Sequence, residues 1–150
     1  MAYAASMCGI RALTAMKHVG MNVAMDPLMT SGYTGAYGGF VIVTADDPNC
    51  HSSQNEQANR YVGLHAYIPV FEPYNPQEAK EMVKYAFDFS ENFRTPVILR
   101  TTTRISHVRG VVTLGSIRKG KVKGEFLKEP SRWVVIPQNA RRLRVEMLKR

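Results

Sequence analysis

Two polar segments of this sequence follow directly on strand-like runs, and their side chains could carry chemistry. Residues 17–22 come after Arg11–Met16, and residues 46–57 come after the more apolar run Phe40–Ala45. Ligands of open parallel sheets bind beyond the carboxyl ends of the strands, which is where these segments are expected. The candidate site residues, all hydrogen-bonding or flexible, are His18, Gly20, Asn22, His51, Ser52, Ser53, Gln54, Gln57 and Arg60.

These residues are hydrogen-bonding groups rather than core formers. Imidazoles and amides can direct hydrogen bonds to a ligand or a neighbouring chain, and histidine titrates near neutral pH. Arg60 can pair with a carboxylate, either of a ligand or of a neighbouring chain. Simpler interpretations remain open, with His18 as a solvated loop residue and His51 as a surface histidine.

Asp46 and Asp47 allow two interpretations. They could be catalytic carboxylates or metal ligands, but Asx side chains routinely bond the backbone amides that follow them, and Pro48 comes next. A cap or turn role is therefore favoured. Cys50 and His51 suggest a nucleophile and its base, yet adjacent residues rarely face each other and no third, orienting group is evident.

The segments that must position these residues alternate between strand and helix patterns. The runs Phe40–Ala45 and Pro96–Thr102 are typical of strands buried on both faces. Shorter strands are expected at Arg11–Met16 and Ile68–Glu72, and helices at residues 2–8, 22–34 and 55–66. The alternation predicts an α/β fold with a parallel β-sheet sandwiched by helices.

The clearest helix begins after Asn75. An asparagine cap is followed by Pro76 at the first helical position and Glu78 at the third, a typical helix start. The predicted apolar face has helical spacing and comprises Ala79, Met82, Val83, Ala86, Phe87 and Phe89.

The positive charge is concentrated at one end of the chain. The net charge is +8, and residues 101–150 contain thirteen Lys and Arg against three Glu. We therefore divide the chain into a domain at 1–107 and a basic extension at 108–150. A solvated linker is the favoured interpretation of the extension, and docking onto an acidic surface of a larger enzyme comes second. Nucleic-acid binding is disfavoured, because no aromatic residues interleave with Arg141–Arg144.

The composition argues against several other classes. No segment approaches the ~20 continuous apolar residues of a membrane span. The two cysteines, Cys8 and Cys50, form no CxxC, so neither a disulfide framework nor a metal site built by this chain alone is expected. A cytoplasmic setting follows as the default. The chain opens inside a helical pattern, which predicts a domain that is incomplete at its N-terminus.

Long stretches of the sequence match a known family pattern. They cover nearly the whole chain and are Met16–Asn22, Asp26–Leu28, Ala45–Pro48, His51–Gln57, Arg60–Tyr61, Pro76–Ala79, Pro96–Arg104 and Ser106–Gly110. Together they closely resemble the alpha subunit of indolepyruvate:ferredoxin oxidoreductase. The resemblance implies a fragment that covers most of the pyrimidine-binding domain of a thiamine-diphosphate-binding fold, followed by the start of a linker.

The resemblance also implies an activity and its partners. Such enzymes oxidatively decarboxylate aryl 2-oxoacids such as indolepyruvate to aryl-acetyl-CoA and pass electrons through iron–sulfur clusters to ferredoxin. The complete enzyme uses thiamine diphosphate with Mg²⁺, and the cofactor carries the organic chemistry. The expected partners are the remaining domains of the alpha subunit, a beta subunit, ferredoxin, the 2-oxoacid and CoA.

Several family features are absent from this chain. The activating glutamate and the Gly-Thr-Pro substrate loop lie upstream of its start, and the diphosphate–magnesium motif and cluster cysteines belong to later domains. No catalytic residue is therefore assigned, and the chain alone is expected to bind no cofactor, to be inactive and to self-associate through uncovered surface. The alternatives are another thiamine-diphosphate 2-oxoacid oxidoreductase or decarboxylase, and a non-catalytic interaction domain.

Overall fold

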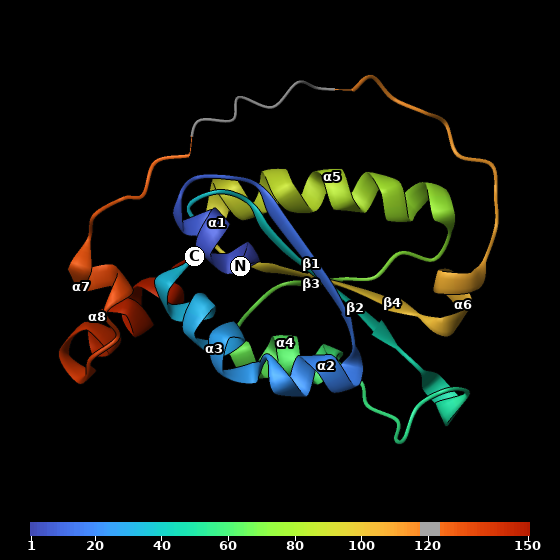
Figure 1. Ribbon diagram of the computed structural model, residues 1–150, viewed down its shortest axis with the longest axis horizontal. Helices are drawn as coiled ribbons and strands as arrows, with labels where there is room; N and C mark the ends of the chain where they lie inside the picture. The colour runs from blue at the N-terminus through green and yellow to red at the C-terminus, as the bar shows by residue number, and fades with distance from the viewer. Residues whose placement is uncertain (118–123) are drawn as a thin grey trace.

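A parallel sheet organises the chain in the computed structural model, which describes residues 1–117 and 124–150. The strands are β1 (Ala12–Lys17), β2 (Phe40–Asp46), β3 (Val70–Phe71) and β4 (Val97–Thr102). They lie in the order β1-β2-β4-β3, and every neighbouring pair is parallel (Figure 1). The predicted α/β class with a parallel sheet is confirmed.

Helices cover both faces of this sheet. Helix α5 (Pro76–Phe93) lies on one face, and α2 (His18–Val23), α3 (Met25–Thr34) and α4 (Arg60–Ala66) lie on the other (Figure 1). The short helix α1 (Ala2–Met7) precedes β1. The sheet therefore stands between two helical layers, as the alternating pattern predicted.

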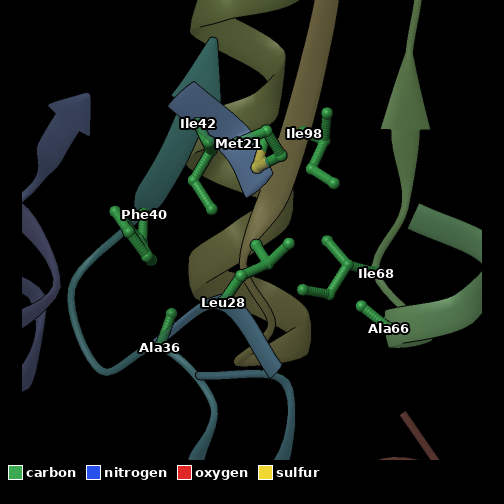
Figure 2. Packing of buried hydrophobic residues seen from close by; sticks show 8 residues of the cluster. All are labelled: Met21, Leu28, Ala36, Phe40, Ile42, Ala66, Ile68 and Ile98. Atoms are coloured by element: carbon green, nitrogen blue, oxygen red, sulfur yellow. The ribbon is translucent and has the colours of Figure 1, made fainter. Parts of the chain in front are cut away.

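Each face of the sheet has its own core. Residues that pair across the strands point to the same face, so Ile42 and Ile98 share one side while Val41 and Val97 share the other. Figure 2 shows the first core, which comprises Met21, Leu28, Ala36, Phe40, Ile42, Ala66, Ile68 and Ile98. The second core joins Val41, Val97 and Leu99 to Ala86 of α5.

Helix α5 starts as the sequence predicts. The Asn75 side-chain oxygen accepts a hydrogen bond from the Glu78 backbone N–H at 2.8 Å, and the Glu78 carboxylate accepts one from the Tyr74 N–H at 2.7 Å. The Glu78 N–H is one of the donors that the first helical turn leaves without an internal partner, and the Tyr74 N–H belongs to the residue just before the cap.

Several boundaries differ from the prediction, and the helix expected at 22–34 begins only at Met25, because α2 occupies residues up to Val23. The predicted loop at residues 17–22 was wrong, because α2 begins at His18 directly after β1. The predicted helix at 55–66 begins only at Arg60, since the N–H of Asn59 donates to Asp46 at 2.9 Å and holds the preceding chain in a loop. The strand expected at Ile68–Glu72 is reduced to β3.

The basic extension is partly folded. It contains α7 (Pro130–Trp133) and α8 (Pro137–Met147), and α8 packs against α3 with Leu143 fully buried. Arg132 and Arg150 donate to the carbonyl oxygens at the end of α3, which complements the negative end of that helix. The solvated-linker interpretation is therefore wrong for α8.

The remaining part of the extension is less regular. Residues 118–123, which carry four of its basic side chains, lie outside the described residues. The role of 108–150 as a connection toward further domains stays a prediction. Among the helices of the described residues, none has the length and apolar character needed to cross a membrane.

Candidate functional site

Three strands end at the same edge of the sheet and place polar residues there. Beyond β1 comes α2, beyond β2 comes the loop of residues 47–59 (the rim loop), and beyond β4 comes α6 (Thr103–His107). A cavity of about 330 Å³ opens at this edge, lined by Lys17, Ala45, Asp46, Asp47, His51, Ser52, Thr103, Ser106 and His107. A second cavity of about 320 Å³ adjoins it and shares His51 and Thr103.

Asp47 organises the first turn of the rim loop. Its carboxylate accepts from the backbone N–H of Ser52 at 2.8 Å and of His51 at 3.2 Å, and from the hydroxyls of Ser53 and Thr103 at 2.8 Å each. These donors, led by the Ser52 N–H, hold the pKa of Asp47 well below its usual range. The favoured turn role is confirmed for Asp47.

Lys17 fastens the same turn from β1. Its ammonium donates to the Ser52 carbonyl oxygen at 2.9 Å and to the Ser53 hydroxyl at 2.5 Å, with Asp47 at 3.5 Å. The end of β1 and the rim loop after β2 are therefore joined directly. The sequence prediction that these two segments meet at one edge is confirmed.

The tip of the rim loop has an unusual backbone. Within the short 3₁₀ turn η1 (Pro48–Cys50), Asn49 and Cys50 have φ angles of 66° and 51°. Such left-handed conformations cost energy in residues other than glycine and persist where surrounding contacts enforce them. The Glu56 carboxylate accepts from the Asn49 N–H at 2.9 Å and provides one such contact.

A buried ion pair closes the base of the rim loop. The Asp46 side chain is fully buried and accepts from the Arg100 guanidinium at 2.6 Å, while the Arg100 side chain is only 5% exposed. Asp46 also accepts from the Asn59 N–H at 2.9 Å, so one carboxylate holds both ends of the loop. Asp46 is thus a structural ion-pair partner rather than the cap of the following turn.

The ion pair continues outward into a charged network. Glu72 accepts from Arg100 at 3.0 Å and from Arg60 at 2.5 and 2.6 Å. The Arg60 hydrogen bonds, aided by the charge of Arg100, lower the pKa of Glu72. Arg60 therefore pairs with Glu72 within this chain, and its pairing with a ligand or a neighbouring chain stays a prediction.

His18 lies beneath the rim loop rather than in the cavity. Its ring is fully buried, and Nε2 lies 3.0 Å from the Asn55 carbonyl oxygen. A carbonyl only accepts, so Nε2 donates this bond, and Nδ1 has no partner among the described residues. The alternative interpretation, in which His18 is a solvated loop residue, is therefore wrong.

The other candidate residues fall into two groups. His51 and Ser52 line the cavity, and Ser53 holds the turn beside it. Gly20 packs on Met16, Asn22 and Gln54 are exposed, and Gln57 donates to the Asn55 side chain at 2.7 Å. Whether any of them contacts a ligand stays a prediction.

The candidate residues predicted from the sequence did not include Arg100, Thr103 and His107, nor Lys17, although Lys17 begins a segment expected at this edge. The sequence did contain a signal for Arg100, because a charged residue inside the buried run of β4 requires a buried partner. Thr103 directly follows the predicted strand Pro96–Thr102, so the carboxyl-end rule could have found it. His107 gave no local signal, since only the folding of α6 over the end of β4 brings it to the cavity.

An apolar cavity of about 190 Å³ lies elsewhere in the molecule. Tyr3, Met16, Met21 and Phe40 are among the residues that line it, between α1 and α2. It offers few polar groups, and it shares no lining residue with the cavity at the carboxyl edge. The chemistry-bearing side chains therefore gather at the carboxyl edge.

Comparison with known proteins gives one consistent result. The chain is 50% identical over 149 residues to indolepyruvate oxidoreductase subunit IorA of Methanothermobacter marburgensis, covering 99% of this chain and 24% of that protein. It is 58% identical over 141 residues to the IorA subunit of Pyrococcus abyssi, and the match covers 91% of this chain and 22% of that protein. It is 53% identical over 150 residues to the IorA subunit of Archaeoglobus fulgidus, and the match covers 99% of this chain and 24% of that protein.

The resemblance to the indolepyruvate oxidoreductase alpha subunit is confirmed. The chain spans about a quarter of the length of these IorA relatives, which accords with a fragment. No family model matches the sequence. The carboxyl-edge residues Lys17, Asp47, His51 and Thr103 thus belong to a segment that resembles IorA.

Proposed function

We propose that this chain forms one part of an indolepyruvate oxidoreductase subunit, with the carboxyl-edge cavity facing a thiamine diphosphate site shared with another domain. The complete enzyme would oxidatively decarboxylate aryl 2-oxoacids to aryl-acetyl-CoA and reduce ferredoxin in the cytoplasm. One observation carries the proposal. A preorganised polar rim lies at the carboxyl edge of a parallel sheet, in a chain that is at least 50% identical to IorA subunits.

The cavity suits a hydrogen-bonding contact to a ligand. Two imidazoles, of His51 and His107, line it together with the hydroxyl of Ser106. Neither imidazole makes a side-chain hydrogen bond with the described residues, so both rings can donate to or accept from a ligand atom or a facing domain. Their expected work is to orient the ligand.

The carboxylates of the rim are already engaged. Asp46 is paired with Arg100, and Asp47 accepts from four donors at 3.2 Å or less. Neither can accept a further proton without losing those bonds, so neither is a suitable acid for activating a cofactor. This fits the inference that the activating glutamate comes from outside the chain.

The thiamine diphosphate would supply the carbanion chemistry of decarboxylation when bound. This chain would contribute the rim that orients the 2-oxoacid beside the cofactor ring. Across the described residues, no group of three or more His, Cys, Asp and Glu could hold a metal ion. We infer from the resemblance alone that the diphosphate–magnesium motif and the cluster cysteines belong to later domains.

A chimeric subunit tests the proposal. The matching segment of the Archaeoglobus fulgidus IorA subunit is replaced by this chain, and the product is purified anaerobically with its beta subunit. We expect reduction of a viologen dye that depends on both indolepyruvate and CoA, and none with the isolated chain. Release of carbon dioxide without dye reduction would instead indicate a non-redox decarboxylase, and a folded but inert chimera would contradict the proposal.

Two histidine variants sharpen the test. His51→Ala in the chimera should lower kcat/KM by about tenfold, which corresponds to one hydrogen bond of about 1.4 kcal/mol. His65→Ala is the matched control, because His65 is exposed in the last turn of α4 and does not line the cavity. Equal activity of the two variants would remove His51 from the site.

A further inference from the structure

The first core of the sheet contains an apolar cavity that the carboxyl edge does not use. It has a volume of about 190 Å³ and lies between α1 and α2, over β1 and the start of β2. Its buried wall comprises four side chains of that core, Met21, Leu28, Phe40 and Ile42 (Figure 2). The cavity is therefore part of the interior of the domain rather than an open face of it.

Small side chains create this space. Ala24 stands at the break between α2 and α3 and lines the cavity. Thr14 lines it from β1, on the same side of the sheet as Ile42, with which it pairs. Protein interiors are close-packed and hold few voids larger than a water molecule, so a cavity of this size is suited to a bound molecule.

The lining has no charge and offers one hydroxyl. None of the described residues that line the cavity has a charged side chain. The Tyr3 hydroxyl is already hydrogen-bonded to Thr34, and burial raises the pKa of Tyr3, as expected in apolar surroundings. The Thr14 hydroxyl has no hydrogen-bond partner among the described residues, so it can bond a ligand atom in the cavity.

The apolar part of the lining favours an aromatic ring. Tyr3 and Phe40 stack with their ring centroids 5.9 Å apart, and Met16 and Met21 line the same space. Thioethers make favourable contacts with aromatic rings, and methionine adapts its shape to what it packs against. An apolar protein cavity of about 150 Å³ accommodates benzene, so the larger volume here leaves room for a ring with small substituents.

We propose that this cavity binds a neutral, single-ring aromatic molecule of the phenol class, with its hydroxyl bonded to Thr14 and its ring against Met21 and Phe40. Aromatic carboxylates and 2-oxoacids are excluded, because burying a carboxylate without a cationic partner is costly. The cavity therefore takes a different class of ligand from the one proposed for the carboxyl edge, and the inference does not depend on the proposed function.

The competing occupant is a side chain from residues that precede Met1 in a longer subunit. Met1 and Pro27 are exposed residues of the lining and mark the mouth of the cavity. A chain that leads into Met1 passes close to this mouth, and an apolar side chain there could fill the space. Ligand binding must therefore be measured both in this chain and in the chimeric subunit.

Methionine methyl signals test the proposal in the isolated chain. After labelling with ¹³C-methyl methionine, p-cresol should shift the NMR signals of Met16 and Met21 in a saturable manner, because both line the cavity. Met82 packs against the second core and Met147 lies on α8, so these two methyls are internal controls. Equal shifts at all four methyls, or no saturable shift at Met16 and Met21, would overturn the proposal.

Three ligands of similar shape distinguish the chemistry. Toluene lacks the hydroxyl of p-cresol, and 4-methylbenzoate carries a carboxylate in its place. We expect p-cresol to bind about fivefold more tightly than toluene, as one net hydrogen bond predicts, and at least about tenfold more tightly than 4-methylbenzoate. Equal affinities for p-cresol and toluene, or tighter binding of the carboxylate, would refute the phenol class.

Two variants locate the ligand. Thr14→Val should remove the preference for p-cresol and leave the affinity for toluene unchanged. Thr113→Val is the matched control, because Thr113 is exposed and does not line the cavity. Ala24→Leu should abolish the binding of both ligands by filling the space, and if it fails to fold, Thr14→Val still decides. A preference for p-cresol that survives Thr14→Val would contradict the assignment.

The chimeric subunit decides between a ligand and the preceding chain. Equilibrium dialysis with labelled p-cresol compares the chimera with its Ala24→Leu variant, and we expect binding that the substitution removes. Equal binding by the two proteins would show that another part of the subunit fills the cavity, and the proposal would fail. Dialysis requires no turnover, so an inert chimera that binds p-cresol at this site would contradict only the proposed function.

Discussion

Replacing Arg100 by methionine should destabilise the domain more than any other single change at the carboxyl edge. Methionine keeps much of the apolar volume but leaves the fully buried Asp46 carboxylate without its cation. Removing one partner of a buried ion pair typically costs about 3–5 kcal/mol. For a domain of this size, that loss corresponds to a fall in melting temperature of about 10 °C.

Urea unfolding followed by circular dichroism measures the loss. Arg60→Met is the matched control, because Arg60 binds the same Glu72 but its side chain is 60% exposed. Exposed pairs contribute about 0–1 kcal/mol, so the control should be nearly neutral. The double variant Arg100→Met, Asp46→Leu should recover part of the stability, since it removes both buried charges.

The comparison can refute the reasoning. If Arg100→Met is no more destabilising than Arg60→Met, the Asp46–Arg100 pair does not hold the base of the rim loop. If the double variant is less stable than Arg100→Met alone, the cost arises from lost packing or from the lost acceptor of the Asn59 N–H rather than from an uncompensated carboxylate. Either result would remove the structural reason for a preorganised rim.

Two further predictions concern the turn and the extension. Because the pKa of Asp47 is lowered on folding, its contribution to stability is complete above its ordinary pKa of about 3.9 and is lost only as the pH falls through the lower folded value. The gap in urea midpoint between the wild type and Asp47→Asn should therefore be equal at pH 7 and pH 5, and a gap already closed at pH 5 would contradict this. Leu143→Ala should cost about 2–5 kcal/mol, because Leu143 is fully buried between α8 and α3. Leu148→Ala, at a residue 59% exposed, should be nearly neutral, and equal urea midpoints for the two variants would restore the solvated-linker interpretation.

Local sequence patterns were sufficient to predict a strand or a helix start where a single signal dominated. The apolar runs predicted β2 and β4 to within a residue, because a strand buried on both faces needs apolar residues at every position. Asn75, Pro76 and Glu78 predicted the start of α5, since capping chemistry depends on neighbours in the sequence. The position of the two polar segments at the carboxyl edge followed from the predicted parallel arrangement of the strands.

Tertiary contacts decided what local patterns missed. The loop character expected at His18 gave way because its ring fits beneath the rim loop, where α2 can start directly after β1. The helix expected from residue 55 was delayed to Arg60 by the hydrogen bond from Asn59 to Asp46. Helix α8 looked like a charged linker, because its few apolar residues matter only through their contact with α3.

Under the proposed function, the arrangement of charges at the carboxyl edge corresponds to a division of roles between domains. Asp46 and Asp47 are both engaged in holding the rim loop, which leaves the imidazoles of His51 and His107 as the ionisable groups best placed to meet a ligand. A rim that is fixed before its partner arrives avoids the entropic cost of ordering a loop at an interface. A carboxylate that must exchange a proton during catalysis cannot also accept four structural hydrogen bonds. Under the proposed function, an acid supplied by another domain leaves the rim loop free to stay rigid, and the rigid rim would then set the position of that acid relative to the substrate.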